Sequence, residues 1–332
     1  MFWITETPKV ITNKDNYVLP ILKRPIHWTR GVANPWAQYG MYMQYIAKQD
    51  NFYATKLLNV YDLDLSSNEK IRIGRTKLIP NPKLIILYCH TVFGSYKEFA
   101  HVANEFRTDP VVYFSYSRKG VHKELHSNSY NVVGCLDTLD IVINHIQSIY
   151  PTVPIHAIGE SAGSCLLIRY MALRNQMKKI KSSVLISPGF NFVKSIRLMN
   201  HFIQDHFLNK IKSKYSQCVT SNLLNANTLM EWAELQYEAT HHNSKLEFLL
   251  ESDPFYLTKQ INVPTITISA LDDFCFPGVI TEESTNLPYE NKNITMVITN
   301  HGGHISFIDY GATISWSSRV AIEHIRCKLT YL

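Results

Sequence analysis

The sequence predicts an α/β fold in which a mostly parallel sheet of about eight strands carries helices on both faces. Three observations lead to this prediction. Short apolar runs of strand length alternate with longer segments of helical spacing, as successive β-α-β units require. The apolar runs are uninterrupted, which is typical of strands that helices cover on both sides. The alternation is interrupted only between residues 191 and 256, and this segment consists of helix-forming sequence.

The individual elements follow from the local patterns in chain order. Residues 58–65 alternate in polarity, and residues 70–79 continue the pattern after a polar turn, so the two runs predict a β-hairpin. Six further strands are expected at 84–89, 111–114, 154–158, 183–187, 265–269 and 294–298. Apolar residues at helical spacing predict helices over 130–149, 161–174 and 314–331.

The remaining segments define the predicted organisation of the chain. Residues 1–55 contain four prolines and no clear period, so we expect an irregular segment that wraps the main body. Residues 56–332 are expected to form a single domain. Within it, residues 191–256 predict a helical insertion above the strand ends, where ligands bind in such sheets. We interpret the insertion as a lid, and a small scaffold away from the site is the alternative.

Composition narrows the class of protein. Hydrophobic residues make up 45% of the 332 residues and charged residues 18%, which is the balance of a folded globular chain. The formal charge of +6 is mild for this length and predicts no nucleic-acid partner. The six cysteines form no C-x-x-C pair. Their wide spacing, the absence of a signal-peptide pattern and the absence of an apolar run of about 18–20 residues lead us to expect a cytoplasmic protein.

The motif with the clearest chemistry is Gly159-Glu160-Ser161-Ala162-Gly163, which matches G-x-S-x-G. It follows a predicted strand and opens a predicted helix, the context that a nucleophile elbow requires. The turn brings the residues two before and two after the serine close together, so Gly159 and Gly163 suit it. Ser161 is therefore the candidate nucleophile.

A serine hydroxyl needs a base, and elbow enzymes supply an acid and a histidine later in the chain. Asp272 and Asp273 follow the predicted strand 265–269, and Asp273 is favoured because it precedes Pro277 by four residues; Asp272 is the alternative acid. His301 and His304 follow the last strand. His304 is favoured because two glycines precede it, and His301 is expected to pack or cap the loop.

The oxyanion of a tetrahedral intermediate needs two preorganised N–H groups. The first is expected from Ala162, which follows the nucleophile. The second is expected from the loop after residues 84–89, where Thr91 and Val92 are the candidates. A simple connector is the alternative for this loop.

These residues together resemble the α/β-hydrolase group that includes medium-chain phospholipases, monoacylglycerol lipases and yeast ethanol acyltransferases. His90 with Gly94-Ser95 resembles its H-G-x-x-G-S loop, although Thr91 stands where the group has glycine. The segment 302–307, Gly-Gly-His-Ile-Ser-Phe, resembles its G-G-H-[IL]-G-F motif, and the Asp272–Asp273 pair has its counterpart there. The resemblance covers roughly residues 58–330. It implies an α/β-hydrolase fold with a helical lid.

The resemblance also implies a function. A serine hydrolase of the esterase or lipase type would cleave a carboxylic ester, of an acylglycerol or a phospholipid among others, through an acyl-enzyme on Ser161. Such a reaction needs neither a metal nor a cofactor. An acyltransferase to an alcohol and a non-catalytic binding module on the same fold are the alternatives. The expected partner is a small-molecule or lipid ester, peripheral membrane contact stays open, and the sequence does not define an oligomeric state.

Overall fold

A central sheet organises the chain. The computed structural model describes residues 3–13, 16–29, 35–65, 69–122, 125, 131–216, 221–240, 242–309 and 314–330. Within these ranges the sheet has nine strands in the order β2-β11-β10-β9-β8-β6-β7-β5-β4. The strands from β11 to β7 in that order run parallel, whereas β2, β5 and β4 are antiparallel to their neighbours. A mostly parallel sheet is therefore confirmed.

All eight predicted strands are present. The hairpin is formed by β4 (Asn59–Asp64) and β5 (Lys70–Arg75). The parallel strands are β6 (Leu84–Cys89), β7 (Val111–Tyr116), β8 (Ile155–Glu160), β9 (Ile180–Ile186), β10 (Thr265–Ala270) and β11 (Ile294–Thr299). In β6, β7, β8, β10 and β11 every residue is buried, as the uninterrupted apolar runs predict.

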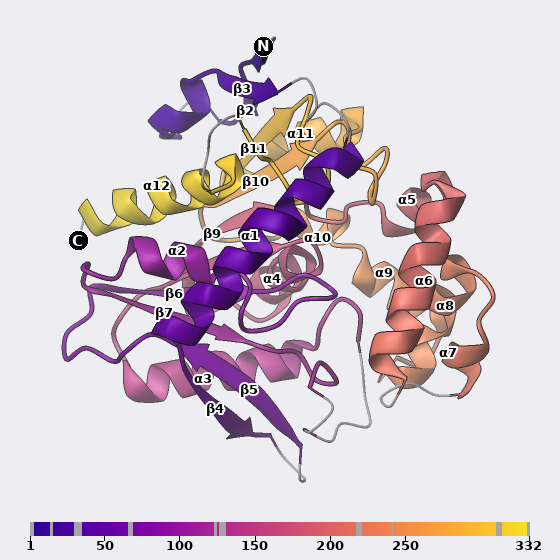
Figure 1. The fold of residues 1–332 in the computed structure, drawn as a ribbon, viewed down its shortest axis with the longest axis horizontal. Helices are drawn as coiled ribbons and strands as arrows, with labels where there is room; N and C mark the ends of the chain where they lie inside the picture. The colour runs from indigo at the N-terminus through magenta and orange to yellow at the C-terminus, as the bar shows by residue number, and fades with distance from the viewer. Residues whose placement is uncertain are drawn as a thin grey trace.

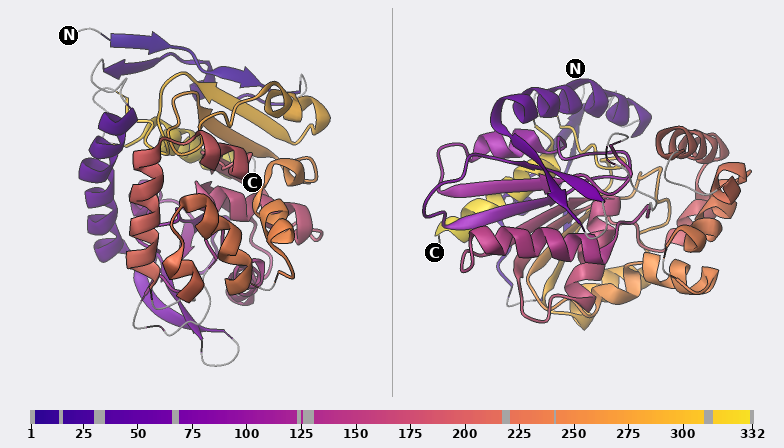
Figure 2. Two further views of the ribbon diagram at one scale, coloured as in Figure 1. Left: turned by 90° about the vertical axis from the view of Figure 1, so that its right-hand side faces the viewer. Right: turned by 90° about the horizontal axis from the view of Figure 1, so that it is seen from below.

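Helices cover both faces of this sheet (Figure 1; Figure 2, right). Alternate residues of β6 point to opposite sides, so Ile85 and Leu87 join one buried core and Leu84 and Ile86 join the other. The first core includes α3 (Leu136–Ile149), α4 (Ala162–Leu173), α10 (Phe255–Thr258) and α11 (Glu282–Glu290). The second includes α1 (Pro35–Leu57), α2 (Ala100–Glu105) and α12 (Trp316–Thr330).

The N-terminal segment differs from the prediction. Residues 1–55 were expected to be irregular, but they contain β1 (Trp3–Glu6), β2 (Lys9–Ile11), a 3-10 turn η1 (Pro20–Lys23), β3 (Ile26–Thr29) and most of α1. The strand β2 extends the central sheet beside β11, and β1 pairs with β3 in a separate two-stranded sheet. The prolines lie in the connections and at the first positions of η1 and α1, where they leave the strands intact.

Residues 191–256 form a series of helices, as the sequence predicts for this segment. They contain α5 (Phe192–Leu198), α6 (His201–Tyr215), α7 (Ser221–Asn225), α8 (Leu229–Leu235), η3 (Gln236–Ala239) and α9 (Lys245–Ser252). These helices gather beside the sheet (Figure 1) and share a core of their own, which includes Tyr215, Trp232 and Phe248. Val132, Val133 and Cys165 of the main body belong to the same core, so the insertion is packed onto the domain.

None of the helices within the described ranges is both long and apolar enough to cross a membrane. Five cysteines in this part of the chain are free thiols: Cys89, Cys135, Cys165, Cys275 and Cys327. The sixth, Cys218, lies outside the described residues.

Candidate active site

Ser161 occupies a strained turn between β8 and α4. Its backbone has φ 53° and ψ −117°, a conformation that few non-glycine residues adopt. The two flanking glycines allow the chain to close around it. A Cβ on Gly159 would lie 2.8 Å from the backbone of Gly163, and a Cβ on Gly163 would overlap the carbonyl of Cys89. The turn therefore has the tight backbone geometry that a nucleophile elbow requires.

The loop that follows β11 carries His304. The loop needs several left-handed backbone conformations, with φ 58° at Gly303, 62° at Ile305 and 41° at Phe307. At Gly302 the φ is 151°, and a Cβ there would lie 2.5 Å from the Phe307 ring. The Gly-Gly pair thus lets the chain fold back tightly and present the imidazole.

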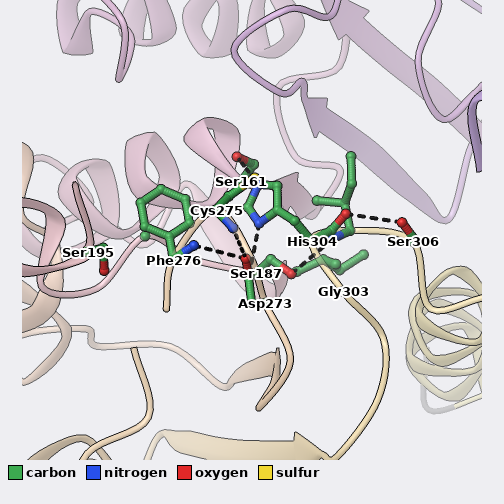
Figure 3. Close-up of polar contacts among 12 residues, drawn as sticks. Ser161, Ser187, Ser195, Asp273, Cys275, Phe276, Gly303, His304 and Ser306 are labelled. Atoms are coloured by element: carbon green, nitrogen blue, oxygen red, sulfur yellow. Dashed lines mark hydrogen bonds and ion pairs between the residues drawn. The ribbon is translucent and has the colours of Figure 1, made fainter. Parts of the chain in front are cut away.

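The structure brings the three favoured residues together (Figure 3). His304 lies between the other two: its Nε2 is 2.7 Å from Ser161 Oγ and its Nδ1 is 2.9 Å from Asp273 Oδ2. All three are buried, with exposed fractions of 4–6%. Because a carboxylate only accepts, Nδ1–H donates to Asp273, which leaves Nε2 free to accept the serine proton. This arrangement can generate a serine nucleophile.

The two adjacent aspartates have different partners. Asp273 Oδ1 accepts from the amides of Cys275 (2.8 Å) and Phe276 (2.9 Å), which holds the carboxylate beside His304 (Figure 3). Asp272 Oδ1 accepts from the Gly303 amide at 2.7 Å. His301 Nδ1 lies 3.6 Å from Asp272 Oδ2. Asp272 and His301 therefore shape the loop that carries His304, and burial raises the pKa of the Asp272 carboxyl.

Two backbone amides near Ser161 are candidates for the oxyanion hole. No described residue accepts a hydrogen bond from the amide of Ala162, the first residue of α4. The Thr91 amide, in contrast, donates to Glu98 Oε2 at 3.0 Å, and the Thr91 hydroxyl donates to Glu98 Oε1 at 2.9 Å. The Thr91 amide therefore already has an acceptor and is not free to bind the oxyanion. Val92 borders the same cavity as Ser161 and His304, and among the described residues its amide has no acceptor.

Arg118 and His90 hold this loop, a role that the sequence analysis did not assign. The Arg118 guanidinium donates to the carbonyls of His90, Thr91 and Val132. His90 Nε2 accepts from the Arg118 amide at 2.9 Å, so its Nδ1–H donates to the Thr91 carbonyl at 2.6 Å. Burial, followed by the Arg118 cation, holds the pKa of His90 well below its usual range, which keeps this imidazole neutral.

Two glutamates form an acidic pair beneath the loop, and they too were missed. Tyr88 Oη lies 2.7 Å from Glu160 Oε2 and 3.3 Å from Glu98 Oε2. Burial raises the pKa of both carboxyls, and the second cause for Glu160 is the neighbouring Glu98 charge. Glu98 lies against Gly94, where a Cβ would overlap its carboxylate. Glu160 meets Tyr88 across 72 residues of the chain, so no local pattern could have revealed the pair.

An apolar cavity opens onto the serine. Its volume is about 70 Å³, and Ser161, Ala162, Val92 and His304 lie in its wall. Most of the rest is lined by hydrophobic residues of the main body and the insertion: Val132, Val133, Cys165, Phe192, Ile196, Met199, Phe207, Ile211, Leu229, Trp232, Ala233, Cys275 and Phe276. The helical insertion thus supplies much of the wall.

Cys275 lies beside Asp273 and His304 and adds a candidate metal ligand that the triad does not use. One ligand atom each of Asp273, Cys275 and His304 lies within 4.8 Å of the others. Burial, followed by the Asp273 charge, raises the pKa of the Cys275 thiol well above its usual range. Both imidazole nitrogens of His304 already have partners, Asp273 Oδ2 and Ser161 Oγ, so neither is free to bind a metal in this arrangement. The geometry fits proton transfer between Ser161 and His304 better.

A second Ser-His-Asp arrangement lies in the core between α1, α2 and α12. His101 Nδ1 is 2.7 Å from Asp50 Oδ1, and its Nε2 is 2.9 Å from Ser318 Oγ. These three residues are 1–3% exposed. Ser318 has ordinary helical surroundings, with its amide bonded to Ser315 Oγ, and no elbow around it. We interpret this set as a link between three helices.

The fold is that of α/β-hydrolases, and the serine, histidine and aspartate at the strand ends are arranged as in serine hydrolases. Residues 80–269 match the Hydrolase_4 family, described as serine aminopeptidase, S33, and the chain belongs to this family. The match contains Ser161 and ends before Asp273 and His304, so those two positions depend on the geometry described above.

The chain is also similar to proteins that are named as a phospholipase and a monoacylglycerol lipase. Bovine phospholipase ABHD3 is 25% identical over 189 residues, which cover 52% of this chain and 45% of the relative. Zebrafish monoacylglycerol lipase ABHD2 is 20% identical over 227 residues, 60% of this chain and 52% of the relative. The chain thus spans about half the length of the curated relatives it matches.

Solved structures show the same fold. A putative lipase from Acinetobacter baumannii has a TM-score of 0.52 at 16% identity, covering 86% of this chain and 95% of that one. Est1E from Butyrivibrio proteoclasticus, solved with ferulic acid bound, has a TM-score of 0.55 at 14% identity, covering 81% and 99%. At these identities the similarity supports the fold alone.

Proposed function

We propose that this protein is a serine carboxylester hydrolase with Ser161, His304 and Asp273 as its catalytic triad. The observation that carries the proposal is the pair of distances through His304, 2.7 Å to the serine oxygen and 2.9 Å to the carboxylate, at an elbow that faces an apolar cavity. Membership of the Hydrolase_4 family and similarity to a named phospholipase and a named monoacylglycerol lipase support it.

The reaction follows from the geometry. Ser161 Oγ attacks the acyl carbonyl carbon while His304 Nε2 takes the hydroxyl proton, and the carbonyl oxygen gains negative charge. The amides of Ala162 and Val92 donate to that oxyanion. His304 then gives its proton to the departing alkoxide, and the acyl-enzyme is left on Ser161. A water molecule, deprotonated by His304, releases the carboxylic acid, and Asp273 stabilises the imidazolium in both steps.

The cavity indicates the class of acyl group. Its apolar wall suits a hydrocarbon chain, and its volume of about 70 Å³ suits a short one. Two relatives are named a phospholipase and a monoacylglycerol lipase, so a glycerolipid with a short acyl chain is the substrate class we propose.

We further propose that the insertion meets a lipid surface. Its surface exposes Phe202 (81%) and Leu198 (55%) near the α5–α6 junction, and Leu246 (65%) and Leu250 (57%) one turn apart on α9. Apolar side chains of this kind insert into the interfacial region of a bilayer. Sedimentation with anionic phospholipid vesicles should therefore recover the protein, and Phe202→Ser with Leu198→Ser should lower the recovered fraction. Equal recovery of the double variant would contradict this contact.

A panel of p-nitrophenyl esters from acetate to palmitate tests the main proposal. We expect hydrolysis with a maximum at short chains, and no activity in Ser161→Ala or His304→Ala. Product analysis with added ethanol distinguishes hydrolysis from acyl transfer, because an acyltransferase would yield the ethyl ester. A well-folded wild-type protein that hydrolyses none of the esters would contradict the proposal and favour a binding module.

A further inference from the structure

The last turn of α6 contacts the loop that holds the Val92 amide. The Tyr215 hydroxyl donates to the Val92 carbonyl, and the Lys214 ammonium donates to the Phe93 carbonyl. Tyr215 is fully buried. It belongs to the insertion, whereas Val92 lies in the loop that follows the central strand β6. Two successive carbonyls of the loop are therefore held by two successive residues of the insertion.

These contacts matter because of how peptide units are built. In a trans peptide the N–H and the C=O point in opposite directions. Arg118 and His90 hold the Thr91 carbonyl, so they direct the Val92 N–H away from themselves. Tyr215 holds the Val92 carbonyl on the next peptide unit. Both units that flank the Val92 Cα are thus fixed, one by the main body and the other by α6.

Side-chain packing strengthens the same contact. Lys210 Nζ lies 4.2 Å from the centre of the Phe93 ring, and the Phe93 and Phe207 rings are 5.5 Å apart. Residues 207, 210 and 214 are spaced by three and four, so they lie on one face of α6. Phe207 also lines the apolar cavity. The same face of α6 therefore lines the cavity and packs against the loop.

We propose that Tyr215 and Lys214 are positioning residues that hold the Val92 amide in place for the oxyanion, so that this donor is complete only while α6 is docked. The inference rests on the proposed ester hydrolysis. It links the position of α6 to two properties of the site, the width of the cavity and the completeness of the oxyanion hole. A displacement of α6 that widens the cavity for a bulky ester also releases the oxyanion loop, and efficient acylation requires α6 to return.

Kinetics of two conservative variants test the proposal. Tyr215→Phe removes one hydroxyl and Lys214→Met one ammonium, and each should lower kcat about 10- to 100-fold, since loss of a complete oxyanion donor costs about 100- to 1,000-fold. The KM for a short ester should change less than about threefold, because the ground-state carbonyl needs the donor less. A trifluoromethyl ketone, whose adduct with Ser161 carries an oxyanion, should lose affinity by the same factor as kcat/KM.

Matched controls exist in the chain. Lys212 also donates to a carbonyl, that of Ala226 within the insertion, and Tyr150 Oη donates to the Ile79 carbonyl at 2.8 Å away from the site. Lys212→Met and Tyr150→Phe should leave kcat and the ketone affinity within about twofold of wild type. Equal losses in the control and test variants would show a general loss of packing and overturn the proposal, as would wild-type values in both test variants.

Hydrogen exchange of the peptide that covers residues 90–94 separates this inference from the function on which it rests. Faster exchange there in Tyr215→Phe and Lys214→Met, and not in the two controls, is the expected result whether or not esters are hydrolysed. Unchanged exchange in an active enzyme would overturn the positioning role alone. An inactive wild type with the expected exchange pattern would overturn the hydrolase proposal and leave the contact between α6 and the loop in place.

Discussion

At the scale of single residues, the neighbours Asp272 and Asp273 show how partners assign roles. Both carboxylates lie near the His304 loop. Asp273 accepts from two backbone amides and from the imidazole, whereas Asp272 accepts from the Gly303 amide. Only Asp273 can stabilise the imidazolium directly.

The pair allows a matched comparison. Asp273→Asn should lower kcat/KM for a short ester by about 1,000- to 10,000-fold, because the amide can fix the wrong imidazole tautomer and carries no charge. Asp272→Asn keeps an acceptor for the Gly303 amide and should cost less than about tenfold. Steady-state kinetics of both variants measure the difference. Similar losses would show that the two carboxylates act as one unit.

A buried histidine pair predicts the pH dependence of stability. Ser182 Oγ lies 2.7 Å from His156 Nδ1 and 2.7 Å from His324 Nε2. Burial first, and then the Lys328 cation, lowers the pKa of His156 to about 4 and that of His324 to about 3. The unfolded chain therefore binds protons from about pH 6.5 downward while the folded chain resists them. The stability that the two neutral histidines contribute is fully present above about pH 6.5. It is lost as the pH falls toward their pKa values in the folded chain.

The size of this loss can be stated and measured. One pKa unit corresponds to about 1.4 kcal/mol. Since the two sites are coupled and do not add in full, we expect a loss of roughly 3–6 kcal/mol between pH 6.5 and pH 4. Urea denaturation across this range measures it. His324→Leu should flatten the dependence, and replacement of His201, which is 82% exposed, should leave it as it is.

At the residue level, the sequence could name candidates where position along a strand limits the chemistry. Ser161, Asp273 and His304 each follow a recognisable buried strand, and the carboxyl ends of parallel strands meet at one edge of a sheet. Glu98 and Arg118 could not be given roles in this way. Their partners depend on how a loop folds in three dimensions, and the sequence alone placed Thr91 and Val92 on equal terms until the Glu98 contact separated them.

At the scale of elements, periodicity decided what could be predicted. The eight core strands are uninterrupted or alternating runs, and all eight were found. The helix α1 was missed because its residues show no clear apolar stripe; it is held through contacts with α2 and by residues such as Ala54, which enter the core beneath it. The sequence predicted helices in the insertion. It could not predict the contacts between the insertion and the Val92 loop, because these depend on how the helices pack in three dimensions.

The insertion should also set the acyl-chain preference. Trp232 lines the cavity and is fully buried, and its indole N–H has no hydrogen-bond partner within the described residues. Trp232→Leu should therefore enlarge the cavity without breaking a hydrogen bond and move the best p-nitrophenyl ester to a longer chain by about two carbons. The control is Phe248→Leu, which alters the insertion core away from the cavity wall. A shift in the control alone would contradict this role for Trp232.

At the scale of the whole molecule, two Ser-His-Asp sets with similar hydrogen-bond distances have opposite surroundings. The Ser161 set lies at the carboxyl ends of the parallel strands, where a strained turn presents the serine to a cavity. The Ser318 set lies within helices α1, α2 and α12, where all three members are sealed by packing. Distances alone therefore do not define an active site, and the topology decides which serine can meet a substrate.

A fluorophosphonate probe tests that argument on the intact protein. We expect one label per chain, located on Ser161 by peptide mass spectrometry and absent from Ser161→Ala. Ser318→Ala should keep the full labelling rate but lose stability by about 1–3 kcal/mol, because His101 Nε2 would be left buried without its partner. Thermal unfolding measures that loss. A label on Ser318 in the folded protein would show that the helical core opens to reagents, and the assignment of this set as a structural link would then be wrong.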